Sequence, residues 1–134
     1  MQLKYAVVVA LVAYAVVEAS WLALMTPFYA RRFAAFAKYS RLALRSLPAA
    51  IAVYAILLVT SWTLVAAPIA RARSTPAQAA IRGGAFGLAV YGVYNLTNKA
   101  TLPGYGWSMV AVDSAWGAGL FAALAAVFAV ALRA

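Results

Sequence analysis

Four long apolar runs separated by short polar stretches dominate the pattern of this sequence. Each run is about 20 residues long, which is the length that an α-helix needs to cross the hydrocarbon core of a bilayer. In lipid every backbone polar group must be satisfied within the protein, so the runs predict helices rather than open strands. The pattern therefore predicts an all-α fold, a four-helix transmembrane bundle, with spans at about 5–25, 48–70, 79–101 and 108–132.

Little chain remains outside these runs, so residues 1–134 are predicted to form a single integral-membrane domain. Pro103 and Gly104 directly follow the third run and are expected to end its helix. Lys4 and the small residues around Glu18 loosely fit a cleaved signal peptide. The apolar run continues to Met25, however, which favours a retained first span.

The polar stretch at about 28–46, between the first two spans, has a pattern of its own. At about 100° per residue, basic and apolar side chains fall on opposite sides of a helix. The basic side carries Arg31, Lys38, Arg41 and Arg45, and the apolar side carries Tyr29, Phe33, Phe36, Leu44 and Leu47. This segregation predicts a short amphipathic helix in the membrane interface, with its basic residues on lipid headgroups. An amphipathic connector that packs on the bundle is the alternative.

Composition strengthens the membrane assignment. Hydrophobic residues make up 68% of the 134 residues and charged residues 10%, against about half and a quarter in an ordinary soluble domain. A chain of this length has no interior large enough to hide so many apolar side chains. This excludes cytosolic globular, secreted and disordered proteins. The alanine-rich, arginine-over-lysine composition is typical of GC-rich bacteria, so we expect a multi-pass protein of the bacterial inner (plasma) membrane.

Eleven basic residues against two acids give a net charge of +9. In a membrane protein this charge favours anionic lipid headgroups as partners, and no motif supports nucleic-acid binding. The sequence contains no cysteine and no histidine, which excludes disulfides, cysteine–zinc sites and a Ser-His-Asp triad. We therefore predict neither a metal site nor a cofactor.

The two acids, Glu18 and Asp113, both fall inside predicted spans. A carboxylate at such depth costs about 3 kcal/mol or more unless it is paired, protonated or solvated. Asn95 and Asn98 lie in the third span near the same membrane face. At about 1.5 Å per residue, all four groups lie within roughly 10 Å of that face. The sequence therefore predicts a polar cluster at one membrane level.

Helical spacing places these residues on stripes with aromatic and small side chains. The candidate binding residues are Glu18, Asn95, Asn98, Asp113, Tyr14, Trp21, Tyr91, Tyr94 and Trp116. Tyr14, Glu18 and Trp21 share one face of the first span, and Asp113 and Trp116 share one face of the fourth. We predict that Glu18 and Asp113 point into the bundle within one or two side-chain lengths of each other, joined by Asn95 or Asn98.

Each of these residues also has a purely structural interpretation. Asp113 could cap a fourth helix that begins there, and Glu18 could reach the interface or stay protonated against a tyrosine hydroxyl. The asparagines could serve only as hydrogen bonds between helices, and the tryptophans as an interfacial belt or packing residues. Small residues at four-residue spacing, Gly83 with Gly87 and Ala118 with Ala122 and Ala126, favour close helix packing.

Several motifs in the sequence resemble one known family. GAFGLAVYGVYNLTNKATLPGYGW from Gly84, VDSAWG around Asp113 and EASWL from Glu18, with Phe28-Tyr29 following, are similar to domain of unknown function family 2177. The resemblance covers essentially the whole chain and implies a four-span bacterial membrane protein without implying a particular activity. In the family pattern, aspartate usually occupies the positions of Glu18 and Asn95. Two acids in place of three weaken the case for tight divalent-metal binding.

Three classes of function remain open from the sequence. The polar cluster could bind or conduct a proton, a monovalent cation or a small polar solute. The chain could instead be a non-catalytic accessory or scaffold subunit, in a homo-oligomer or with a larger membrane partner. A lipid-modifying enzyme with Glu18 or Asp113 as general acid or base is the least favoured, since few catalytic side chains are present.

Overall fold

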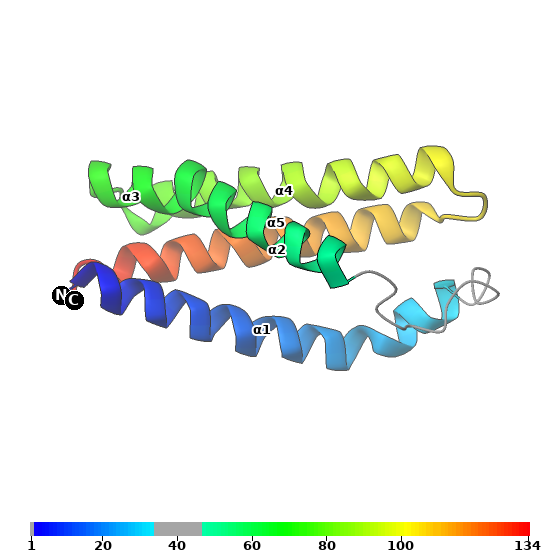
Figure 1. Ribbon diagram of the computed structural model, residues 1–134, viewed down its shortest axis with the longest axis horizontal. Helices are drawn as coiled ribbons and strands as arrows, with labels where there is room; N and C mark the ends of the chain where they lie inside the picture. The colour runs from blue at the N-terminus through cyan, green and yellow to red at the C-terminus, as the bar shows by residue number, and fades with distance from the viewer. Residues whose placement is uncertain (1, 34–46) are drawn as a thin grey trace.

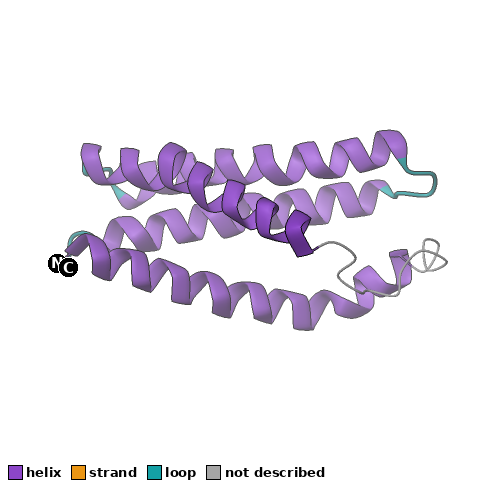
Figure 2. Ribbon diagram, viewed as in Figure 1, coloured by secondary structure: helices purple, strands orange, loops and turns teal. Residues whose placement is uncertain are grey.

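The computed structural model describes residues 2–33 and 47–134, and these form helices joined by short turns, without a strand among them. The elements are α1 (Gln2–Phe33), α2 (Leu47–Ser61), a π-helical turn (Trp62–Ala66), α3 (Ala67–Ala72), α4 (Pro76–Thr101) and α5 (Trp107–Ala131). Figure 2 shows that α2, the π turn and α3 follow one another as one rod. The predicted all-α bundle of four long helical segments is confirmed.

The most extensive contacts in the described part of the chain join α1, α4 and α5, and the hydrophobic core also includes Val65 of the π turn and Ile69 of α3. α4 and α5 run antiparallel with the most extensive contact in the molecule, and α1 lies along α5 (Figure 1). The α2–α3 rod contacts the other helices mainly through its π turn and α3. The two ends of the chain lie together at one end of the bundle, and the turn between α4 and α5 lies at the other. Asn95 lies six residues before the end of α4 and Asp113 six residues after the start of α5, so both lie toward the turn end.

Glycines explain the close approach of α4 and α5. A Cβ on Gly83 would overlap the Phe121 carbonyl and lie 2.6 Å from the Ala125 Cβ, and a Cβ on Gly87 would overlap the Gly117 carbonyl. The predicted Gly83–Gly87 pair therefore lies in a helix interface, as small residues at this spacing do in membranes. Gly84, by contrast, would make only ordinary contacts with Ala118 and Ala122 at 3.5 Å.

Within residues 2–33 and 47–134, three helical segments are long and apolar enough to cross a membrane: Gln2–Arg32, Leu47–Ala72 and Trp107–Ala131. α4 has a similar length, 26 residues, but carries Arg82, Asn95, Asn98 and Lys99 and is less apolar. Because α4 packs against α5, Asn95 is fully buried inside the bundle, whereas Asn98 and Lys99 are partly buried and Arg82 is exposed.

The π turn in the α2–α3 rod has a local cause. Pro68 has no N–H and cannot donate to the Leu64 carbonyl one turn earlier. The Arg82 guanidinium of α4 instead donates to that carbonyl at 3.3 Å. A proline that disturbs the helical ladder and a cation from a neighbouring helix thus meet at the same backbone group, which ties the rod to α4.

The first helix is longer than the sequence pattern predicted. α1 does not end near Met25 but continues through Pro27 to Phe33, and beyond its midpoint it bends toward the turn end of α5 (Figure 1). A proline inside a helix removes one backbone hydrogen bond and favours such a bend. The prediction that Tyr29 lies on the lipid face of a separate helix is therefore wrong.

Arg31 is exposed near the end of α1. Lys38, Arg41 and Arg45 lie outside the described residues, and so does most of the predicted interfacial helix at 28–46. Their contact with anionic headgroups stays a prediction.

Candidate functional site

Asp113 is the centre of the polar cluster. α5 begins at Trp107 with Gly106 as its N-cap, so Asp113 lies in the second turn and does not cap the helix. Its Oδ1 accepts a hydrogen bond from the Tyr29 hydroxyl at 2.7 Å, and its Oδ2 accepts one from the Asn95 amide at 2.7 Å. One carboxylate therefore connects α1, α4 and α5.

Asn95 is fully buried in α4. Its amide nitrogen donates to Asp113 and to the Tyr91 carbonyl at 2.8 Å, and its oxygen accepts from the Tyr105 hydroxyl at 2.5 Å. Tyr105 lies in the turn between α4 and α5, where burial raises the pKa of its phenol and a hydrogen bond with Asn98 only partly offsets this rise. The phenol therefore remains protonated and able to donate to Asn95 at neutral pH.

Glu18 joins the cluster through aromatic side chains. The Trp116 indole donates to Glu18 Oε2 at 3.2 Å and stacks on Trp21, with 4.0 Å between ring centroids and 5° between planes. Trp21 in turn donates to the Tyr29 hydroxyl at 3.1 Å. These contacts connect Glu18 to Asp113, and the two carboxylates are near enough for their charges to repel each other.

The predicted bridge between the two acids differs from the observed one. Asn95 bonds Asp113 but, among the residues described, makes no hydrogen bond with Glu18. The connection is made instead by Trp116, Trp21 and Tyr29. Because Trp116 follows Asp113 by three residues, the same face of α5 holds both ends of this connection.

The remaining candidates lie around or away from the cluster. The Tyr91 ring packs against Gly117, which has no side chain to obstruct it. Tyr14 lines a separate apolar groove between the helices. Tyr94 is 59% exposed and does not join the cluster. Trp107 is also exposed, as an interfacial tryptophan would be, and Lys99 lies over its ring at 5.5 Å.

Two residues of the cluster, Tyr29 and Tyr105, were not among the sequence candidates. Tyr29 continues the stripe of Tyr14, Glu18 and Trp21 along α1 once the helix is extended past Met25. That periodicity was the available signal. Tyr105 follows Pro103 and Gly104 in the turn between α4 and α5, and Gly104 has a φ of 80°. The position of Tyr105 depends on this turn backbone, which helical periodicity does not describe.

The donors to both acids are neutral. Asp113 and Glu18 accept from a phenol, a carboxamide and an indole in the described residues. The nearby cation Arg32 instead donates to Ser108 at 3.0 Å and lies over the Phe28 ring at 3.8 Å. Among the described residues, the two acids of the cluster thus accept hydrogen bonds from neutral donors, and no basic side chain is bonded to either of them.

Comparison with known protein families assigns the chain to one of them. The model of the family described as "Predicted membrane protein (DUF2177)" matches residues 3–131. The chain belongs to this family. The match includes all three helices that form the polar cluster. No curated protein and no solved structure matches the chain. The chain is therefore an integral membrane protein, and the chemistry of the cluster must be argued from its geometry.

Replacing Tyr105 by phenylalanine is expected to lower the free energy of unfolding by about 1–3 kcal/mol. The change leaves the fully buried oxygen of Asn95 without its hydroxyl donor. Thermal unfolding in detergent, followed by circular dichroism, measures the difference. Tyr5→Phe is the matched control, because Tyr5 is 56% exposed. Equal stability of the two variants would contradict this account of Asn95.

Proposed function

We propose that this protein binds or conducts a proton, a monovalent cation or a small polar solute at the carboxylate cluster. The carboxylate cluster consists of Glu18, Tyr29, Asn95, Tyr105, Asp113 and Trp116. The observation that carries the proposal is the hydrogen bonding of Asp113, whose two oxygens each accept from a neutral donor at 2.7 Å. We further propose that the protein resides in the bacterial inner membrane as a multi-pass protein, with anionic lipids around it.

Neutral donors stabilise a carboxylate without removing its charge. Two nearby acids in a poorly solvated site resist joint ionisation, so binding of one proton or one small cation lowers the electrostatic energy of the pair. The hydroxyl of Tyr29 and the amide of Asn95 also hold the Asp113 oxygens in fixed positions. Such pre-positioned oxygens suit a ligand with a single positive charge better than a large or anionic one.

Access from one membrane face supports the same function. Tyr105 and Ser108 lie at the turn end of the bundle, and Arg32 bonds Ser108 there. Asp113 follows Ser108 by five residues, or about 8 Å along the helix. A small ligand that entered from this face would therefore travel a short distance before it reached the carboxylates.

Flux measurements in proteoliposomes test the proposal. We expect the purified protein to speed dissipation of an imposed proton or potassium gradient, reported by a pH-sensitive dye or an ion-selective electrode. Glu18→Gln removes one charge but keeps an acceptor for the Trp116 indole, and it should lower the flux. Tyr5→Phe should leave the flux unchanged. Flux equal to that of protein-free liposomes for every gradient would overturn the proposal.

A scaffold role is the second candidate, and one specific observation favours it. The hydrogen bonds of Asp113 and Asn95 connect α1, α4, α5 and the turn between α4 and α5. Such a network could serve only to specify the bundle, within a homo-oligomer or beside a larger membrane partner. In that case the variants should change the melting temperature and leave no flux to lose.

A further inference from the structure

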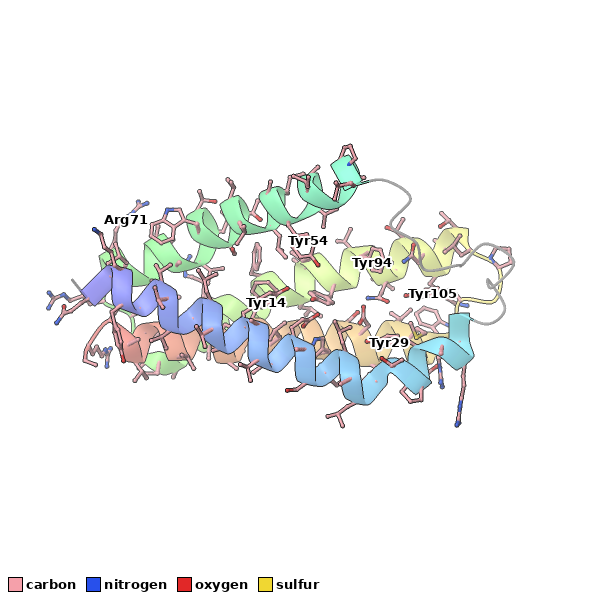
Figure 3. All side chains as sticks on the ribbon, turned by 60° about the horizontal axis from the view of Figure 1, so that its bottom comes forward. Tyr14, Tyr29, Tyr54, Arg71, Tyr94 and Tyr105 are labelled. Carbon is pink, nitrogen blue, oxygen red and sulfur yellow. The ribbon has the colours of Figure 1, made fainter. Side chains whose placement is uncertain are left out.

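A second feature of the bundle lies apart from the carboxylate cluster. A groove of about 570 Å³ runs between α1, the α2–α3 rod and α5. Its walls come from residues within 7–14, 54–66 and 121–128, and no charged residue is among them. Tyr14 and Tyr54, from the two facing helices, lie near the middle of the molecule (Figure 3).

Two phenol hydroxyls line this groove, one from Tyr14 and one from Tyr54, which is 60% exposed. Among the described residues, neither the Tyr14 nor the Tyr54 hydroxyl has a hydrogen-bond partner. The hydroxyl of Ser61, which also lines the groove, has a partner within its own helix, because it donates a hydrogen bond to the Leu58 carbonyl at 3.1 Å. A polar group in a hydrocarbon environment is costly without a partner. An occupant with one polar end would supply it.

The neighbouring charges decide which polar end is compatible. Glu18 lies one helical turn from Tyr14 on the same face of α1, and Glu18 is near enough to interact electrostatically with Asp113. An anionic end group, such as a carboxylate or a phosphate, would be repelled there. A neutral hydroxyl avoids this repulsion and can both donate to and accept from the two phenols.

The volume and the apolar lining of the groove suit a hydrocarbon chain. Its volume lies within the range of about 300–1,000 Å³ that is usual for small-molecule sites. Trp62, Val65 and Ala66 of the π turn form part of one wall, and π turns in helices occur frequently at functional sites. The bond from Arg82 to the Leu64 carbonyl holds this part of the rod against α4.

We propose that the groove binds a long-chain alcohol, with its hydrocarbon chain against the apolar walls and its hydroxyl on Tyr14 and Tyr54. The bilayer is the source of such a ligand, so it reaches the groove laterally between the helices. This site is separate from the carboxylate cluster. Binding of the alcohol in the groove does not depend on the proposed transport at that cluster.

Photo-crosslinking tests the proposal on the full chain in phosphatidylcholine nanodiscs. The probe is hexadecanol that carries a diazirine on its chain, and the label is located by peptide mass spectrometry. We expect labelling of the groove walls that excess hexadecanol removes and excess hexadecanoate does not. The double variant Tyr14→Phe/Tyr54→Phe should bind hexadecanol about tenfold more weakly, as expected for two lost hydrogen bonds. Tyr5→Phe, which lies outside the groove, should bind as the native chain does.

A second variant fills the groove while leaving the hydroxyls in place. Ala66→Phe adds a ring to the wall and should abolish labelling there, whereas Ala85→Phe on the exposed face of α4 should not. Equal competition by hexadecanoate or by excess phosphatidylcholine would show an unselective groove and overturn the proposal. So would unchanged affinity in the double tyrosine variant. Binding is measured without any gradient, so an absence of ion flux would not affect this result.

Discussion

Gly87→Ala is expected to lower the free energy of unfolding by about 1–3 kcal/mol, the usual cost of inserting atoms into a packed interface. The added Cβ would overlap the Gly117 carbonyl and lie 3.0 Å from the Phe121 Cβ. A backbone carbonyl cannot rotate away as a flexible side chain can, so α4 and α5 must separate. Thermal unfolding in detergent and resistance to dodecyl sulfate measure the loss.

Gly92→Ala is the matched control on the same helix. There the nearest atom outside the local backbone is Leu88 Cδ1 at 3.9 Å, so the new methyl group has room. Alanine also has a higher helix propensity than glycine, and Gly92→Ala should therefore be neutral or slightly stabilising. If both variants unfolded alike, helix propensity rather than close packing would determine the role of Gly87.

The arrangement of α4 and α5 shows what the sequence could predict. The lengths of the apolar runs predicted the two helical segments. Gly83 and Gly87, at four-residue spacing, predicted that one of these helices packs closely against a neighbour. The partner surface was less accessible to prediction. Gly117, Phe121 and Ala125 of α5 face Gly83 and Gly87, whereas Ala118 and Ala122 face Gly84. The rotation of one helix about its axis depends on side-chain fit across the interface, which a single sequence does not contain.

The end of α1 shows where hydrophobic patterning fails. Arg31 and Arg32 interrupt the apolar run, so the pattern predicted a span that ended near Met25. In the structure α1 continues with Arg31 exposed and with Arg32 bonded to Ser108. Long basic side chains can extend from a helix end toward the interface. The change of polarity in the sequence therefore does not coincide with the end of the helix.

This difference explains the error in the predicted site. A first helix that ended at Met25 would place Tyr29 on a separate interfacial segment. The continued helix brings it to Asp113, with Pro27 favouring a bend on the way. The two acids and Asn95 were predicted as one cluster, and the hydrogen bonds of Asp113 and Asn95 confirm that pair as neighbours. The connection from Asp113 to Glu18 passes through Tyr29, Trp21 and Trp116. Because the sequence pattern did not place Tyr29 near Asp113, it did not predict this connection.

Replacing Asp113 separates a binding role from a structural one. Asp113→Asn keeps an oxygen of similar shape as an acceptor for Tyr29 or Asn95, but it removes the titratable charge. We expect a folded protein whose proton or cation flux in proteoliposomes falls to that of protein-free liposomes. Asp113→Ala removes both acceptors and leaves the Tyr29 and Asn95 donors without this partner. It should lose the same flux and also lower the free energy of unfolding by about 1–3 kcal/mol for each donor left unsatisfied.

The contrast between the two variants is decisive. Ser114→Ala is the control, because the Ser114 hydroxyl is buried next to Asp113 without a hydrogen-bond partner among the described residues. It should keep both fold and flux. If Asp113→Asn retained full flux, the charge of Asp113 would not take part in binding. The hydrogen bonds that connect α1, α4 and α5 would then remain as the reason for an acidic residue at this depth.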